Sequence, residues 1–253
     1  MSEHVLLDEG DGPAVLLLPG LSLDERLFAP IVPHIAAAHR LVVVRIARAG
    51  SIAAMGARAL AVADALGIGR FHLGGLSMGG YACLEAWRQF PARIRSLSLI
   101  NTQARTDSPA TRQRRNSVIR LCETGHHDRV VRPFLNRILS PRHAADPRLR
   151  DLVLAMTNDA GPDAMAEDTR AILGRGDYED VLPIINVPSL VLSGWHDFLA
   201  PPREAGRMAS IIPGAELHIL DDCGHLCTLE QPRAVAHIVA RFLARVDAPQ
   251  AVA

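Results

Sequence analysis

The chain contains no lysine. All 27 of its basic residues are arginine, and they balance 27 acidic residues, so the formal net charge is zero. Without lysine the protein can form no lysine Schiff base, which excludes pyridoxal phosphate enzymes and class I aldolases. A P-loop is excluded too, because that motif needs a lysine on the β- and γ-phosphates. The charge balance also argues against a nucleic-acid partner, which would call for a basic excess.

Long apolar runs are also missing. No stretch approaches the roughly 18 consecutive apolar residues of a membrane-spanning helix, so we expect no membrane partner. The first dozen residues include the acids Glu3, Asp8 and Glu9 and lack the basic start of a secretory signal, which predicts a cytoplasmic protein. The four cysteines form no C-x-x-C pair and are interpreted as reduced, packed thiols. The 253 residues, 49% of them hydrophobic, are enough to bury a substantial core.

Short continuous apolar runs alternate with helical periodicity at both ends of the chain. Such runs are typical of strands that are covered on both faces, so the pattern predicts β-α units around a mostly parallel sheet. Helices are expected over 52–66, over 78–89 and from Pro232 onwards. The expected strands contain residues 15–18, 41–44, 71–73, 97–100, 189–193 and 216–220.

The pattern changes between about residue 104 and residue 185. This segment has helical stretches, punctuated by Pro133, Pro141, Pro147 and Pro162, and no convincing strand. We therefore expect one α/β domain that is interrupted by a helical insertion.

The motif G-x-S-x-G follows the expected strand at 71–73, with Ser77 at its centre between Gly75 and Gly79. A strand that turns abruptly into a helix leaves the serine hydroxyl exposed above the helix N-terminus, and the glycines let neighbouring segments come close. The alternative interpretation is a tight packing turn with a structural serine. The strand before the motif and the helix after it favour a nucleophile.

A serine nucleophile needs a base to take its proton and an acid to orient that base. His225 follows the last expected strand, and Asp197 follows the strand before it. Loops at the carboxyl ends of neighbouring parallel strands converge on one crevice. The order Ser77, Asp197, His225 is the one expected when a nucleophile elbow opens the site.

Two other acids lie near His225 in the sequence. Asp221 and Asp222 are within four residues of it, but they fall at a strand end, where solvated or turn-stabilising aspartate is usual. Asn101 follows another expected strand, but an amide cannot stabilise an imidazolium as a carboxylate does. Asp197 therefore remains the preferred acid.

The chain resembles the α/β-hydrolase superfamily over nearly its full length, on four ordered matches. Within the superfamily it looks most like small capped esterases and lactonases of the 3-oxoadipate enol-lactonase type. The resemblance implies an α/β-hydrolase core formed by residues 1–103 and 186–253, with residues 104–185 as a helical cap. The four matches are Val15–Gly20, Gly75–Gly80, Gly194–Asp197, and Gly224–His225 with Glu230–Pro232.

The same resemblance implies two donors for an oxyanion hole. These are the backbone N–H groups of Met78 and of Leu21, with Ser22 as the alternative to Leu21. The loop at 45–50 departs from the family, because an arginine-containing segment replaces the usual acidic, glycine-rich one. The shape of one side of the entrance is therefore not predicted.

The cap has an uneven charge distribution. Residues 105–150 hold eleven arginines against four acids, whereas residues 151–185 hold eight acids against two arginines. Surface pairing between the halves is the simpler interpretation. The alternative is that an arginine grips a substrate carboxylate. The candidate substrate contacts are Arg112 and Arg115, with Arg114 and Arg120 close by, and Trp195.

Together these features predict a serine hydrolase for a small carboxylic ester or lactone, with the cap as a lid that shapes the acyl pocket and excludes water. No cofactor is expected, and no metal either, because Cys223, His225 and Cys227 lack a second ligand pair nearby. Carbon–carbon bond hydrolysis, amide hydrolysis and perhydrolysis use the same triad and remain open. A non-catalytic, receptor-like ligand-binding member of the family is the alternative of a different class.

Overall fold

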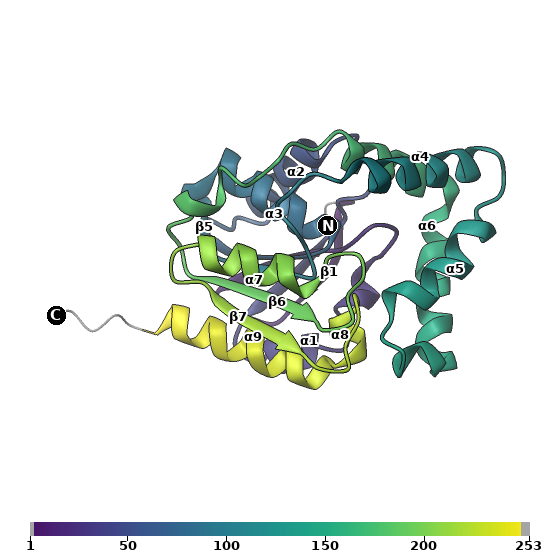
Figure 1. The fold of residues 1–253 in the computed structure, drawn as a ribbon. Coiled ribbons are helices and arrows are strands. Elements are labelled where there is room, and N and C mark those ends of the chain that lie inside the picture. Colours follow the sequence, from purple (N-terminus) through teal and green to yellow (C-terminus); the bar gives the residue numbers. More distant parts are fainter. Residues whose placement is uncertain (1–2, 249–253) are drawn as a thin grey trace.

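A seven-stranded sheet forms the centre of the molecule in the computed structural model, which describes residues 3–248 (Figure 1). The strand order is β1-β3-β2-β4-β5-β6-β7; β1 pairs with β3 antiparallel, and all other neighbours are parallel. The predicted mostly parallel α/β fold is thus confirmed. The strands are β1 (Val5–Glu9), β2 (Ala14–Leu18), β3 (Arg40–Val44), β4 (Phe71–Leu76), β5 (Ile94–Ile100), β6 (Ser189–Gly194) and β7 (Glu216–Leu220).

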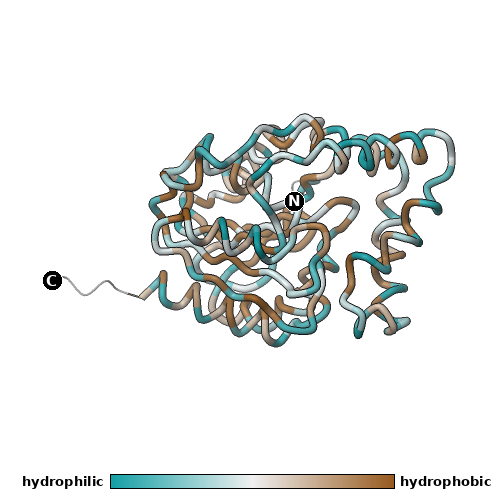
Figure 2. Tube along the Cα trace, viewed as in Figure 1, coloured by the Kyte–Doolittle hydropathy of each residue, from teal (hydrophilic) through white to brown (hydrophobic). Residues whose placement is uncertain are grey.

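Helices cover both faces of this sheet. Successive residues of a strand point to opposite faces, so Leu16 packs in one core cluster and Leu17 in the other. Figure 2 shows how hydrophobic residues concentrate in the central strands. The first face packs against α2 (Ile52–Ala65), α3 (Met78–Gln89) and α7 (Pro202–Ile211), and the second against α1 (Val32–Ile35), α8 (Cys227–Glu230) and α9 (Pro232–Asp247).

The segment between β5 and β6 is helical and projects to one side of the sheet (Figure 1). It contains α4 (Pro109–Glu123), α5 (Asp128–Ile138) and α6 (Pro147–Leu173). Gly161 interrupts α6 with φ 78° and ψ 169°, and Pro162 follows it. Because these dihedral angles are not helical, α6 consists of two helices joined at a kink. Short 3-10 turns complete the fold at Glu25–Leu27, Pro91–Arg93, His143–Ala145 and Leu182–Ile184.

Ion pairs join the basic and acidic parts of the cap. Arg175 lies 3.1 Å from Asp107, and Arg105 lies 3.1 Å from Glu179. Arg170 also pairs with Glu123. Only the Arg105–Glu179 pair joins an arginine of the basic part to an acid of the acidic part, as the charge pattern predicts. In the other two pairs the arginine comes from the acidic part, and the Arg175–Asp107 pair is buried. No helix within residues 3–248 is long and apolar enough to cross a membrane.

Candidate active site

Ser77 occupies a strained turn between β4 and α3. Its φ is 57° and its ψ is −112°, a combination that residues with a Cβ rarely adopt. The Ser77 backbone N–H donates to the carbonyl of Ile100 (3.0 Å), and the Thr102 hydroxyl donates to the carbonyl of Ser77 (2.8 Å). The turn is thus held from the carboxyl end of the neighbouring strand, β5.

The glycines around Ser77 are required by close backbone contacts. A Cβ at Gly79 would collide with the Leu18 carbonyl oxygen, and a Cβ at Gly75 would collide with the backbone of Gly79. A Cβ at Gly80 would lie 2.5 Å from the Thr102 side chain. The first turn of α3 therefore packs directly on the ends of β2 and β4, as the motif predicted.

Asp197 and His225 form a buried hydrogen-bonded pair. Asp197 Oδ2 lies 2.8 Å from His225 Nδ1, and the two residues are 2% and 4% exposed. Asp197 Oδ1 accepts the backbone N–H groups of Leu199 (2.8 Å) and Ala200 (3.0 Å). These bonds fix the carboxylate, so it can orient the imidazole with Nε2 free to act as a base.

Asn101 connects the two parts of the site, a role that sequence reasoning missed. Its Nδ2 group donates to Asp197 Oδ2 (2.8 Å) and to the Gly224 carbonyl (3.2 Å). Its own backbone has φ 45°, and its neighbours on both sides bond to Ser77. Asn101 therefore ties the serine turn to the histidine loop. Its position just after a buried strand, beside the strand that carries the serine, is the signal that could have indicated this.

Ser77 itself makes no side-chain hydrogen bond to any residue within 3–248, His225 included. The segment around Asn101 thus connects the serine turn to the Asp197–His225 pair, but the three side chains do not form one continuous chain of hydrogen bonds. Such bonds are often long in unliganded enzymes and shorten when substrate binds.

Glu230 holds the histidine loop in place and was missed as a positioning residue. Its Oε2 accepts the backbone N–H groups of Ser140 and Gly224, both at 2.9 Å, and its Oε1 accepts that of Leu226 (3.2 Å). The His225 N–H donates to the Ile138 carbonyl (2.7 Å). The loop that carries His225 is therefore attached to the segment that follows α5.

We expect Glu230→Gln to destabilise the protein and to reduce its activity. The glutamine amide must place an NH2 group where the carboxylate now accepts a backbone N–H, which leaves a buried donor without an acceptor. The expected loss is about 1–3 kcal/mol of unfolding free energy. Because His225 would be displaced, kcat should fall by roughly tenfold or more. Urea unfolding and turnover of a short ester measure the two effects.

Glu216→Gln is the matched control for this substitution. Glu216 is half-exposed and pairs with Arg245 at the surface, so its neutralisation should change stability by less than about 1 kcal/mol. A Glu230→Gln variant that unfolds at the wild-type urea midpoint would show that the three accepted bonds do not anchor the loop.

The alternative acids lie away from His225. Asp221 and Asp222 are exposed, and Asp222 approaches His196, at 4.0 Å. The cysteines near the site, Cys223 and Cys227, are buried, and burial raises the pKa of both thiols. They therefore stay protonated and do not compete with Ser77 as nucleophiles.

The loop after β2 lies against the serine. A Cβ on Gly20 would come within 3.5 Å of Ser77 Cβ, and the Leu23 N–H closes a turn onto the Gly20 carbonyl (3.2 Å). Within residues 3–248, the backbone N–H groups of Leu21 and Met78 have no hydrogen-bond acceptor in the protein. Both are therefore available to an oxyanion. The Ser22 hydroxyl is buried and also lacks a partner among these residues.

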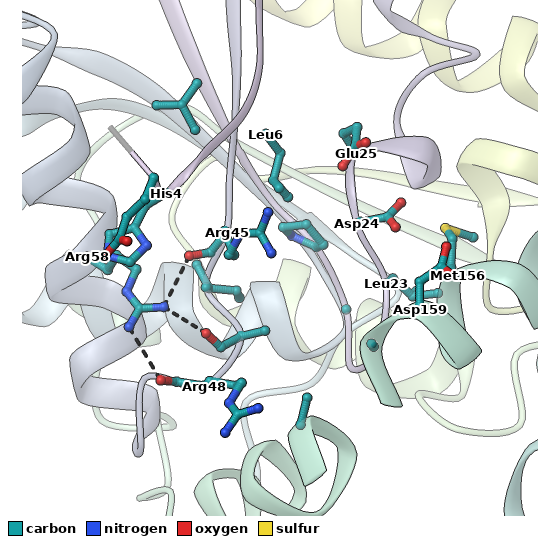
Figure 3. A pocket seen from close by; sticks show the side chains of 18 residues that line it. His4, Leu6, Leu23, Asp24, Glu25, Arg45, Arg48, Arg58, Met156 and Asp159 are labelled. Carbon is teal, nitrogen blue, oxygen red and sulfur yellow. Dashed lines mark hydrogen bonds and ion pairs between the residues drawn. The ribbon is translucent and has the colours of Figure 1, made fainter. Parts of the chain in front are cut away.

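A cavity of about 1040 Å³ adjoins the same loop (Figure 3). Pro19, Gly20 and Leu23 line it on the core side, and Met156 and Asp159 of α6 line it on the cap side. The 45–50 loop forms another wall, where Arg58 donates to the carbonyl oxygens of three of its residues. Ser77 is not part of the cavity lining; Gly20 separates the two.

The candidate substrate contacts lie elsewhere. Arg115 pairs with Asp107, and Arg112 donates to the Leu173 carbonyl (3.0 Å), so both guanidinium groups are engaged within the cap. Trp195 is 61% exposed on the loop that also carries Asp197. None of the three lines the cavity described above. Their contact with substrate stays a prediction.

Comparisons with known proteins agree with this architecture. A family model described as the alpha/beta hydrolase fold matches residues 13–232. A thermophilic esterase from Thermogutta terrifontis is 29% identical, with a TM-score of 0.90 over 95% of this chain and 92% of that one. An enol-lactonase from Burkholderia xenovorans is 25% identical, with a TM-score of 0.87 over 94% of this chain and 95% of that one.

A curated relative is an uncharacterised carboxylesterase from Bacillus subtilis. It is 26% identical over 72% of this chain, and the match spans only 60% of that protein's length. The family model covers far more than half of the present chain and includes the segments that hold Ser77 and Asp197. The chain belongs to the α/β-hydrolase fold family and has esterase and lactonase relatives.

Proposed function

We propose that the protein is a serine hydrolase that cleaves a small carboxylic ester or lactone through an acyl-enzyme intermediate. The observation that carries the proposal is the buried Asp197–His225 pair, which Asn101 attaches to the strained Ser77 turn. A structural serine needs neither a strained backbone nor a histidine oriented by a buried carboxylate. The esterase and lactonase relatives support the same reaction class.

In the proposed reaction Ser77 Oγ attacks the substrate carbonyl while His225 Nε2 accepts the serine proton. Asp197 holds the imidazole through Nδ1 and stabilises its positive charge. The tetrahedral oxyanion binds to the N–H groups of Met78 and Leu21, each worth about 3–4 kcal/mol in comparable sites. His225 then protonates the leaving alcohol, and water activated by His225 releases the acid.

The cavity beside Gly20 is the proposed place for one half of the substrate. It lies next to the oxyanion loop, and its opposite wall is α6 of the cap. Cap residues that cover the reacting carbonyl would keep bulk water away from it. Arginines on the 45–50 loop and acids on the facing wall give the lining charged groups beside its apolar residues, and the arginines could bind the oxygens of a short substrate.

A fluorophosphonate probe tests the reaction class. We expect stoichiometric covalent labelling of the wild-type protein, with the label on the peptide that contains Ser77. Short and long p-nitrophenyl esters, lactones, amides and β-diketones, together with a peracid-formation assay, then rank the reactions by kcat/KM. The proposal requires short esters or lactones to rank first. Wild-type protein that takes up no label would contradict it and favour a receptor-like role.

A further inference from the structure

A second cluster of ionisable side chains lies at the opposite, amino end of the strands. His39 directly precedes β3, His72 is the second residue of β4, and Asp247 is the last residue of α9. The two histidines are buried, at 5% and 1% exposure. His39 Nε2 lies 3.0 Å from Asp247 Oδ2, and His72 Nε2 lies 3.3 Å from Asp247 Oδ1. One donor atom from each residue lies within 4.8 Å of the other two.

His72 has one ring nitrogen engaged and one without a hydrogen bond. Nδ1 lies 2.8 Å from Ser96 Oγ, whereas the buried Nε2 has no hydrogen-bond partner within residues 3–248. A proton on Nδ1, donated to Ser96, leaves the lone pair of Nε2 directed at the cluster; metal-binding histidines are commonly held in this way.

We propose that His39, His72 and Asp247 bind a divalent transition-metal ion, with Zn²⁺ as the best fit. Two imidazole nitrogens and one carboxylate oxygen are donors that Zn²⁺ accepts, with water in the fourth position. With bonds of about 2.0–2.2 Å, tetrahedral geometry places donor atoms roughly 3.3 Å apart. His39 Nε2 lies 3.0 Å from one Asp247 oxygen and His72 Nε2 lies 3.3 Å from the other, so each histidine–carboxylate separation is close to this spacing.

Arg95 competes with the ion. Its Nη2 lies 2.6 Å from Asp247 Oδ1, so a cation already occupies one side of the carboxylate. The Arg95 side chain is 34% exposed and can turn into solvent when an ion binds. The bound ion would join the end of α9 to the amino ends of β3 and β4. Its expected role is therefore structural and separate from the chemistry at Ser77.

Zinc titration of chelator-dialysed protein tests the site. We expect one equivalent of Zn²⁺ by equilibrium dialysis and metal analysis. At a free Zn²⁺ concentration about 100 times the Kd, Tm should rise by roughly 5 °C or more. Co²⁺, used as a spectroscopic probe in the same protein, should give the visible absorption of a tetrahedral site.

Substitutions at the proposed ligands and at control histidines test where the ion binds. Asp247→Asn and His39→Gln should each weaken Zn²⁺ binding by about 10-fold or more and remove the Tm shift, whereas Arg95→Met should strengthen binding. His34→Gln, at an exposed histidine, and His225→Gln, at the candidate active site, should leave the zinc stoichiometry unchanged. If His39→Gln does not fold, Asp247→Asn decides the question. Wild-type protein without saturable Zn²⁺ binding, or an Asp247→Asn variant with wild-type affinity, would overturn the proposal.

Discussion

Replacing Ser77 with alanine is expected to lower kcat for a short ester by about 10⁴-fold or more, because Ser77 is the proposed nucleophile that forms the acyl-enzyme. Substrate affinity should change little, since the oxyanion donors and the cavity beside Gly20 remain in place. Steady-state turnover of wild type and variant, with the inactive variant expressed and purified in parallel, measures the effect. Retention of more than about a hundredth of wild-type turnover would point to another nucleophile.

Ser77→Gly separates the chemistry from the backbone strain. Glycine adopts φ 57° and ψ −112° at little cost, whereas alanine carries the same Cβ penalty as serine. Both variants should be inactive, but Ser77→Gly should have the higher Tm of the two. A lower Tm for glycine would indicate that the turn at Ser77 is not strained.

Asp197→Asn should reduce kcat by about 10⁴-fold while the fold is preserved. The backbone N–H groups of Leu199 and Ala200 both bond to Oδ1, so the asparagine must place its oxygen there. Its NH2 group then takes the Oδ2 position, where it faces the NH2 group of Asn101 and the Nδ1 atom of His225. A donor at that position favours the histidine tautomer that cannot accept the serine proton at Nε2.

The exposed acids beside His225 provide matched controls. Asp221→Asn and Asp222→Asn remove the same charge within four residues of His225 in the sequence, but neither carboxylate contacts the imidazole. Both variants should keep wild-type kcat within about threefold. If the Asp197→Asn variant keeps wild-type kcat and one of these two variants does not, Asp197 is not the acid that orients His225.

Much of the fold could be predicted from local sequence, because strands buried on both faces need continuous apolar runs. All six expected strands are present, and the helices over 52–66 and 78–89 begin and end within a residue of their expected bounds. β1 was missed. As the antiparallel edge strand it is only half-buried, and its sequence Val5–Glu9 mixes apolar and acidic residues.

The candidate site was predictable only where a local motif or chain order indicates a role. Ser77 stands in such a motif, and the loops after β6 and β7 supply Asp197 and His225. The roles of Asn101 and Glu230 could not be assigned in this way, since each residue also bonds to a residue that is distant in the chain. The partner of Asn101 lies 96 positions away, and that of Glu230 lies 90 positions away at Ser140. Such pairs become visible only once the chain is folded.

The bonds of Glu230 determine which end of the cap can move. One carboxylate oxygen is shared between Ser140, which follows α5, and Gly224 beside His225. Moving Ser140 away would remove one hydrogen bond from the buried Glu230 carboxylate, at a cost of about 1–3 kcal/mol. It would also disturb the loop that carries His225. We therefore expect this end of the proposed cap to stay in place. If substrate enters by opening the α4 end, beyond the break at Gly161, we expect His225, the proposed base, to stay undisturbed.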